Sequence, residues 1–327
     1  MRKFAHRNAR TLDEAASYLK RLAGKARILA GGTDLLGKMK DEIMPGYPEA
    51  VLNIKTIPGL EFAREEEGCL RVGALARLED IASDQGIRRG YRALAQAAFR
   101  TASPHIREMG TIGGNICQDI RCWYYRTPQN RFPCLRKGGG RCYAIKGDNR
   151  YHSIFGGSVS GGCLAVHPSD TAPALIALDA AVKTSKRTIS AERFFDVGIE
   201  KTTVLDVDEI VTEITFPKSP ENSASAFVKF AARKTIDFPI VNCAARISFS
   251  EGKVIKSRIC LNAVYVTPKR CPEAEEVLEG RALNVDSATQ AARAVTAKAE
   301  PLSHNRYMVP ITEAVLQRTL LACCNGF

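Results

Sequence analysis

The segment that decides the fold begins with Gly110-Thr111-Ile112-Gly113-Gly114-Asn115 and ends with Leu164-Ala165-Val166-His167-Pro168-Ser169-Asp170. Its first residues place a glycine pair beside a hydroxyl group. Because glycine tolerates positive φ and has no Cβ, such a turn lets backbone amides point at an anion. The segment also holds five of the eleven cysteines, namely Cys117, Cys122, Cys134, Cys142 and Cys163. The segment therefore predicts a phosphate-binding turn followed by a stretch in which the cysteine sulfur atoms have a chemical role.

A second glycine turn lies about 80 residues earlier, in Gly31-Gly32-Thr33-Asp34-Leu35-Leu36. A short buried strand is expected directly before it, at residues 26–30. One glycine pair after a strand is more often only a tight turn. Two such turns are more informative, because two loops can hold the pyrophosphate of a dinucleotide from opposite sides. We therefore expect a dinucleotide site between them.

Composition places the chain among globular proteins of a reducing compartment. The 327 residues are 45% hydrophobic, which is enough for two or three domains with a sizeable core. An odd number of cysteines without a small secreted scaffold fits thiols that stay free or bind metal. No apolar run reaches the ~18 residues of a membrane span, and residues 7–10 are polar where a secretory signal would be apolar. We expect a cytoplasmic protein with no membrane span.

The net charge of +12 suits nucleic acid, an anionic cofactor or an acidic partner subunit. Lys and Arg are spread along the whole chain, and no DNA-reading motif is present. We therefore expect no nucleic-acid partner.

Strands and helices alternate through the first two thirds of the chain. Thr11 and Glu14 form a capping box before a helix-spaced apolar run. The pattern then predicts the following elements: strands at 50–54, 70–72, 181–183 and 209–216, and helices at 90–99 and 172–178. This alternation favours an α/β arrangement.

The polar stretch Pro217-Lys218-Ser219-Pro220-Glu221-Asn222-Ser223 is the clearest linker, and we place the domain boundary there. Beyond it the pattern predicts strands at 226–233, 241–249 and 254–264, the last two forming a hairpin, and helices at 286–299 and 312–323. This part reads as a smaller α+β domain.

The cysteines between residues 121 and 162 lie in a glycine-rich stretch without a long apolar period. An irregular stretch of that length is uncommon in a compact domain unless something holds it together. The spacing Cys122-x11-Cys134-x7-Cys142-x20-Cys163 contains no C-x2-C pair. By spacing alone a metal site and free buried thiols both remain open, and four thiolates suit zinc as well as an iron-sulfur cluster. Cys117 is expected to pack near the phosphate turn, and the remaining six cysteines are expected to be core or surface thiols.

With these residues together, the chain resembles the FAD-binding (medium) subunit of the molybdenum hydroxylase family, which includes xanthine dehydrogenase and carbon monoxide dehydrogenase. The resemblance covers nearly the whole length. Residues 29–36 match the first flavin loop of the family, residues 110–115 the second, and residues 168–170 a turn whose Asp contacts the flavin. Residues 226–229 resemble the start of the C-terminal domain, whose Lys approaches the flavin, and Val211 falls where an apolar residue packs near it.

The stretch between the second glycine turn and Asp170 resembles an insertion found in the β subunit of 4-hydroxybenzoyl-CoA reductase and in the flavin subunit of bacterial aldehyde oxidoreductases. There, four cysteines bind an extra [4Fe-4S] cluster. The matching pieces are Arg121-Cys122-Trp123-Tyr124-Tyr125, Pro133-Cys134, Arg141-Cys142 and Cys163-Leu164-Ala165-Val166-His167-Pro168. The resemblance thus implies Cys122, Cys134, Cys142 and Cys163 as cluster ligands.

The resemblance implies an α+β fold in which a two-lobed FAD-binding domain of the PCMH/vanillyl-alcohol-oxidase type (1–218, with an insertion at about 121–163) precedes a smaller α+β domain (222–327). Its cofactors are FAD and a [4Fe-4S] cluster. The cofactor-binding residues it implies are Leu29, Ala30, Gly31, Gly32, Thr33, Asp34, Leu35, Thr111, Ile112, Gly113, Gly114, Asn115, Asp170, Val211 and Lys229. The two threonines and the glycine amides are expected to hold the pyrophosphate.

The implied function is electron transfer within an oligomeric oxidoreductase. The expected partners are a molybdopterin-binding large subunit, a [2Fe-2S] small subunit, and ferredoxin or NAD as external carrier. The sequence presents no catalytic residues of its own, such as a Ser-His-Asp set, so the chemistry is expected to belong to cofactors. Two alternatives stay open: a zinc-stapled scaffold subunit without a redox role, and a stand-alone FAD oxidase of the vanillyl-alcohol type.

Overall fold

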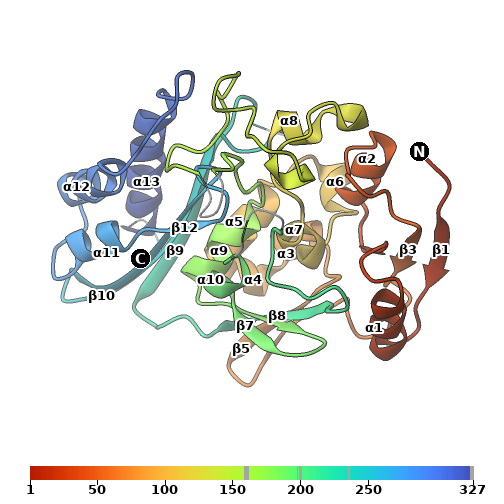
Figure 1. Cartoon of the computed structure of the whole chain (residues 1–327). Coiled ribbons are helices and arrows are strands. Elements are labelled where there is room, and N and C mark those ends of the chain that lie inside the picture. Colours follow the sequence, from red (N-terminus) through yellow and green to blue (C-terminus); the bar gives the residue numbers. More distant parts are fainter. Residues whose placement is uncertain (158–161, 197, 199–200, 235, 325–327) are drawn as a thin grey trace.

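Three separate β-sheets organise the part of the chain that the computed structural model describes, residues 1–157, 162–196, 198, 201–234 and 236–324 (Figure 1). Residues 158–161 of the predicted insertion and 325–327 of the predicted C-terminal domain lie outside the described residues. Two of the sheets belong to the two lobes of the N-terminal part, and the third belongs to the C-terminal part.

The first lobe contains a parallel sheet of order β1-β3-β2. Its elements are β1 (Ala5–Asn8), α1 (Leu12–Arg21), β2 (Ala26–Leu29), α2 (Leu35–Lys40) and β3 (Ala50–Asn53). The predicted start of α1 is confirmed, because the Glu14 amide donates to Thr11 Oγ1 at 3.1 Å. The Glu14 carboxylate accepts from the amide of Arg10, at 2.8 Å, and not from that of Thr11. The apolar face of α1 then packs on the sheet through Ala15 and Leu19.

The second lobe is built on an antiparallel sheet of order β4-β5-β8-β6-β7. The strands are β4 (Ala63–Glu66), β5 (Cys69–Gly73), β6 (Ala181–Thr184), β7 (Thr188–Ser190) and β8 (Val211–Pro217). The helices are α3 (Leu78–Ser83), α4 (Gln85–Gly90), α5 (Arg92–Phe99), α6 (Pro104–Arg107), α7 (Ile112–Ile116), α9 (Thr171–Ala177) and α10 (Ala191–Phe194). The predicted alternation of strands and helices, with the parallel pairing typical of it, is confined to the first lobe. In the second lobe β4 is followed directly by β5 and β6 by β7, and β5 pairs antiparallel with the distant β8.

The C-terminal domain packs three helices against an antiparallel sheet of order β12-β11-β10-β9. Its elements are β9 (Ser223–Phe230), β10 (Val241–Ser250), β11 (Lys253–Asn262), β12 (Lys269–Arg270), α11 (Pro272–Leu278), α12 (Val285–Thr296) and α13 (Met308–Cys324). The predicted hairpin is confirmed. The predicted strand at 226–233 is displaced, because pairing with β10 extends back to Ser223 and the chain leaves the sheet after Phe230.

Four strands, β1, β4, β7 and β12, have no counterpart in the sequence pattern, and β1 and β4 show why. Both lie at sheet edges, and most of their side chains are exposed. They form through backbone pairing with β3 and β5, so neither carries the apolar alternation by which a half-buried strand is recognised.

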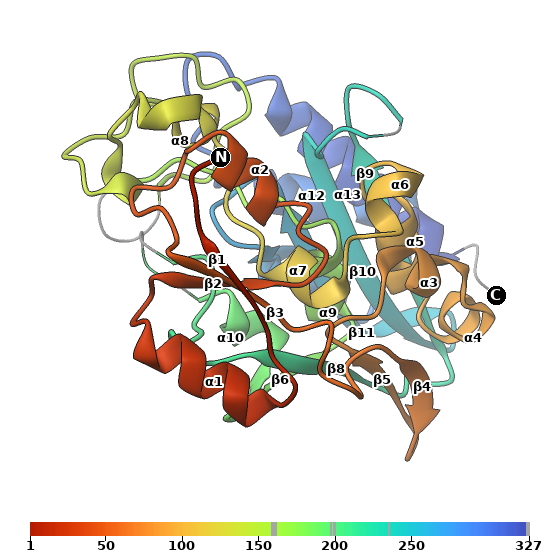
Figure 2. The ribbon, with the colours of Figure 1, turned by 90° about the vertical axis from the view of Figure 1, so that its right-hand side faces the viewer.

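The cysteine-rich segment is irregular, as predicted, apart from three short helices: α8 (Trp123–Arg126), η1 (Pro128–Asn130) and η2 (Leu135–Lys137). It lies beside α2 of the first lobe in both views (Figures 1 and 2). Cys122, Tyr125 and Cys134 share a buried apolar cluster with Met39 of α2. The segment is therefore packed onto the helix that follows the first glycine turn.

A buried ion pair joins the N-terminal part to the C-terminal sheet. The carboxylate of Asp170, which directly precedes α9, accepts from Lys229 Nζ at 2.6 Å and from Asn242 Nδ2 at 2.7 Å. Lys229 and Asn242 are cross-strand neighbours on β9 and β10. The side chains of Asp170 and Lys229 are each 3% exposed. Burial raises the pKa of the Asp170 carboxyl, and Lys229 and Asn242 oppose that rise.

We expect Lys229→Met to destabilise the protein strongly, because it leaves the Asp170 carboxylate buried with only an amide partner. Removal of one member of a buried pair costs about 3–5 kcal/mol. Urea unfolding measures the change, with Lys253→Met as the matched control on the exposed surface of β11. A loss no larger than that of the control would contradict the structural role of the pair.

Candidate cofactor site

A cavity of about 440 Å³ lies where the two lobes and the C-terminal domain meet. Both glycine turns line it, together with residues from 203–211 and from 236–238. Its volume falls in the range of ligand pockets, roughly 300–1,000 Å³. The cavity is therefore the candidate site for the expected dinucleotide.

The first glycine turn presents free backbone donors to this cavity. Within the described part of the chain, the amides of Gly32, Thr33 and Asp34 donate to no acceptor. Gly32 has a φ of +75°, a conformation that favours glycine. Backbone amides left unpaired in such a turn are the donors that bind a phosphate.

The second glycine turn has a different role. The Gly113 amide donates to the Ala74 carbonyl at 2.9 Å, and the Gly114 amide donates to Thr111 Oγ1 at 3.1 Å. The expectation that these two amides are free for a pyrophosphate is therefore wrong. A Cβ on Gly113 would lie 2.8 Å from the Ala74 oxygen, so glycine is needed here to seat α7 against the end of β5.

The two turns touch each other at the edge of the cavity. A Cβ on Gly31 would lie 2.0 Å from the Met109 carbonyl oxygen, a separation that only glycine avoids. The Cβ position of Gly110 lies 3.7 Å from Thr33 Oγ1. The turns thus form one continuous wall, although they are about 80 residues apart in sequence.

Most of the predicted cofactor-binding residues line this one cavity. They are Ala30, Gly31, Gly32, Thr33, Asp34, Leu35, Thr111, Gly113, Gly114, Asn115, Asp170 and Val211. The other three lie behind the wall. Leu29 packs against the core of the cysteine segment, Ile112 is buried in the core of the second lobe, and Lys229 reaches the cavity through its ion pair with Asp170.

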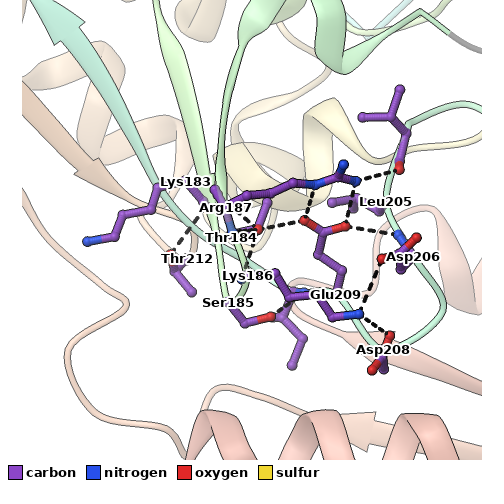
Figure 3. A network of polar contacts seen from close by, with 12 residues as sticks. Lys183, Thr184, Ser185, Lys186, Arg187, Leu205, Asp206, Asp208, Glu209 and Thr212 are labelled. Carbon is purple, nitrogen blue, oxygen red and sulfur yellow. Dashed lines mark hydrogen bonds and ion pairs between the residues drawn. The ribbon is translucent and has the colours of Figure 1, made fainter.

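Residues 203–210 form a part of the cavity wall that the sequence did not indicate. Glu209, whose side chain is fully buried, accepts from Arg187 Nε and Nη2 at 2.9 Å each, from Thr184 Oγ1 at 2.7 Å and from the Asp206 amide at 3.0 Å (Figure 3). Burial raises the pKa of this carboxyl, but the hydrogen bonds outweigh it and lower the pKa to about 2. A single Glu in an alternating strand pattern does not predict these contacts. The two side-chain partners come from the end of β6 and from the turn that follows it.

A second, smaller cavity is lined by all four cysteines predicted as ligands. Cys122, Cys134 and Cys163 are buried and Cys142 is partly buried. Cys117 lines the large cavity beside the second glycine turn, as expected from its sequence position. Within the described residues, no three His, Cys, Asp or Glu side chains stand close enough together to hold a metal ion.

Two cationic side chains at the cysteine cavity have nitrogen atoms without a hydrogen-bond partner, although Arg136 Nη1 donates to the Lys201 carbonyl at 3.4 Å and Lys137 Nζ lies 5.1 Å from the centre of the Tyr125 ring. Arg136, which lines the cavity, has buried Nε and Nη2 atoms without a hydrogen-bond partner, and the Lys137 Nζ next to it also has none. Residues 121–163 contain eight Arg and Lys side chains against one Asp, which is more than half of the net charge of the chain. Buried cationic donors without partners are costly. An anionic group between the cysteines, such as a thiolate-bound iron-sulfur cluster, would satisfy them, so the donor set fits the implied cofactor.

Burial favours the protonated form of two of these thiols, Cys122 and Cys134. Burial raises the pKa of Cys122 to about 12 and raises that of Cys134. Burial also lowers the pKa of Lys137. A metal centre would have to displace the thiol protons on binding, which makes its assembly dependent on pH.

The fold and the large cavity define a two-domain protein with a candidate dinucleotide site between its lobes. Residues 2–219 match the family described as the FAD binding domain in molybdopterin dehydrogenase, and residues 226–322 match the CO dehydrogenase flavoprotein C-terminal domain. The chain belongs to this family of FAD-binding subunits of molybdopterin dehydrogenases.

Two relatives cover between 88% and 98% of the chain. It is 32% identical to the aldehyde oxidoreductase FAD-binding subunit PaoB of Escherichia coli (strain K12), over 98% of both chains. It is 28% identical to the nicotinate dehydrogenase FAD-subunit of Eubacterium barkeri, over 88% of this chain and 83% of that one. A solved structure of carbon monoxide dehydrogenase from Hydrogenophaga pseudoflava superposes with a TM-score of 0.79 at 26% identity, covering 99% of this chain and 98% of that one. The predicted fold class, a two-lobed FAD-binding domain with a smaller C-terminal domain, is confirmed.

None of the helices in the described ranges is long and apolar enough to cross a membrane.

We expect Gly31→Ala to weaken FAD binding by about tenfold or more, which corresponds to ~1.4 kcal/mol. The added Cβ would collide with the Met109 carbonyl oxygen and push the two turns apart. Equilibrium dialysis of FAD against the apoprotein measures the affinity. Gly37→Ala on α2 is the matched control, because its Cβ meets nothing within 4 Å. Equal affinities for the two variants would contradict the role given to this contact.

We expect Glu209→Gln to lower the free energy of unfolding at pH 7 by about 1–3 kcal/mol, since it removes charge-assisted hydrogen bonds. The folded-state pKa of Glu209 is lowered, so its contribution is complete above pH ~4.5 and is lost as the pH falls towards about 2. Urea unfolding from pH 7 to pH 3 should therefore show the difference from wild type shrinking with acid. Glu221→Gln in the exposed linker serves as control, and a difference that stays constant with pH would contradict the assignment.

Proposed function

We propose that the chain is the FAD- and [4Fe-4S]-carrying electron-transfer subunit of a multi-subunit molybdenum hydroxylase. In this proposal it links a [2Fe-2S] subunit to an external electron carrier. The observation that carries the cluster part is the convergence of Cys122, Cys134, Cys142 and Cys163 on one cavity bordered by cationic nitrogen atoms without a hydrogen-bond partner. The flavin part rests on the family and on relatives named as FAD-binding subunits.

The residues assigned to FAD divide by the type of contact that the cavity offers. The free amides of Gly32, Thr33 and Asp34 would bind the pyrophosphate, where negative charge rewards inward-pointing donors. Thr111 and Asn115 lie on the second turn of the same continuous wall, and the other predicted residues of the two turns complete it. Val211 gives apolar contact. When bound, the flavin supplies exchange between two-electron and one-electron steps.

The Asp170 and Lys229 pair would fix the wall near the ribityl chain or ring. Both groups are already committed to each other at 2.6 Å, and Lys229 Nζ also donates to the Arg100 carbonyl at 3.0 Å. Their contribution to the cofactor would therefore be electrostatic and geometric. They hold a charged pair beside the cavity, with two of the three Lys229 N–H donors already bonded.

The proposed cluster site is tied to the proposed flavin site through Asp34. Its carboxylate accepts from Arg126 Nη1 at 2.7 Å and from the Asp119 amide at 3.0 Å. Arg126 lies on α8, between the first two cysteine ligands, while Asp34 ends the first glycine turn. The cysteine segment thus helps to hold the turn that presents the free amides, which supports two neighbouring cofactors in one subunit.

The remaining parts of the proposal concern assembly and location. The partners are a molybdopterin-binding large subunit and a [2Fe-2S] small subunit, in line with relatives named as medium chains and FAD subunits. Ferredoxin or NAD is the proposed external carrier. We also propose domain bounds of 1–218 and 222–327, close to the two family matches, and a cytoplasmic location in view of eleven free cysteines.

Cofactor analysis of the anaerobically purified chain tests the proposal. We expect about one FAD with about four iron and four sulfide per chain. FAD without iron would contradict the cluster. Zinc without flavin would contradict the proposal as a whole and favour the scaffold alternative. Substrate-driven flavin reduction by the isolated chain would favour the stand-alone oxidase.

Cys134→Ser should remove iron and sulfide but leave FAD bound, because Cys134 lines only the smaller cavity. Cys69→Ser on β5 is the control and should leave both cofactors at wild-type content. Loss of FAD together with iron in Cys134→Ser would show that the cysteine segment is needed to fold the flavin site.

A further inference from the structure

One histidine contacts a predicted cluster ligand. His152 Nε2 lies 3.2 Å from Cys122 Sγ, and the residue is 1% exposed. In the described part of the chain, this is the only side-chain hydrogen bond to any of the four cysteines. His152 lies inside the cysteine-rich segment, but it stands 30 residues from Cys122, so the sequence does not predict their contact.

The ring of His152 is held from several sides. Its centroid lies 5.9 Å from those of Trp123 and Tyr124, the two residues that follow Cys122. Its amide donates to the Asn149 carbonyl at 3.1 Å. Its carbonyl accepts from Asn305 Nδ2 of the C-terminal domain at 2.9 Å. The ring is therefore fixed against the sulfur by packing and by main-chain contacts.

The direction of the hydrogen bond follows from the second ring nitrogen. Nδ1 of His152 is buried and has no hydrogen-bond partner. A neutral imidazole carries one N–H, and a metal-bound thiolate can only accept. With the proton on Nδ1, a donor would be buried unpaired while the Nε2 lone pair faced the negative sulfur. The proton therefore belongs on Nε2, which donates to Cys122 Sγ.

We propose that His152 is a positioning residue that donates its Nε2–H to Cys122 Sγ and raises the reduction potential of the [4Fe-4S] cluster. This inference rests on the proposed function. Hydrogen bonds to the sulfur ligands are one of the protein's means of setting cluster potentials. The added electron makes the thiolates better acceptors, so a donor stabilises the reduced form more than the oxidised form. Reduction adds one electron, and the proton stays on Nε2.

The test is a redox titration of the purified chain with dithionite, monitored by electron paramagnetic resonance of the reduced cluster. His152→Leu removes the donor, and we expect its midpoint to fall so that the ratio of reduced to oxidised cluster at a given potential drops about tenfold, which is ~59 mV for one electron. His152→Gln keeps an N–H donor and should recover most of the difference. His105→Leu, on the exposed surface of α6, should leave the potential unchanged.

A second measurement does not depend on the His152→Leu variant holding its cluster. Wild-type protein labelled with ¹⁵N in histidine should show a nitrogen coupled to the reduced cluster in pulsed resonance spectra, and this coupling should be absent from the labelled His152→Gln protein. An unchanged potential in an iron-replete His152→Leu protein, or no histidine coupling in the wild type, would overturn the inference and leave the cluster standing. A wild-type chain without iron would instead refute the proposed function itself.

Discussion

The arrangement of the two domains depends on the ion pair and the hydrogen bond that the buried carboxylate of Asp170 forms with the C-terminal sheet. Lys229, Asn242 and Asn262 lie side by side across β9, β10 and β11. The first two bind the Asp170 carboxylate, and Asn262 Nδ2 donates to the Ser169 carbonyl at 2.7 Å. One polar row on the C-terminal sheet therefore holds the turn before α9. Because an isolated carboxylate is very costly in an apolar interior, this turn can occupy its place only when the C-terminal sheet is docked.

That docking fixes one wall of the large cavity, and contact between the glycine turns fixes another. Glycine serves different ends in the two turns. In the first it leaves amides free and lets Gly31 meet the Met109 carbonyl, while in the second it lets α7 pack against Ala74. The two motifs look alike in sequence but have different roles in the structure. The first turn supplies free backbone amides, and the second allows close packing of the main chain.

The sequence predicted the elements whose signals are local. The start of α1 follows from Thr11 and Glu14, and the hairpin of β10 and β11 from alternation around a turn. The gathering of four cysteines was also predictable, although from resemblance and not from spacing. Contacts between residues distant in sequence were not predictable. Glu209 forms an ion pair with Arg187, which lies far from it in sequence. The amides of Gly113 and Gly114 have hydrogen-bond acceptors that only the folded chain reveals. The local sequence pattern shows which groups can form hydrogen bonds or ion pairs, but it does not show which of them lie close together in the fold.

The cysteine segment also packs against α2 and contacts the first glycine turn. It buries Cys122 and Cys134 against Met39 of α2, and its Arg126 reaches the carboxylate that ends the first glycine turn. Asp119 takes a hydrogen bond from Tyr125 at 2.5 Å, while Lys38 lies 3.2 Å from Asp119 and 3.5 Å from Asp34. In this network Asp34 and Asp119 are matched by Arg126 and Lys38, whereas Arg136 and Lys137 have no carboxylate in the described structure. The segment therefore satisfies its charges on the side that faces the glycine turn and leaves cations in excess on the side that faces the cysteines. This polarity supports the proposed cluster, because an anion at the cysteine cavity would give these nitrogens a partner and a metal could displace the thiol protons.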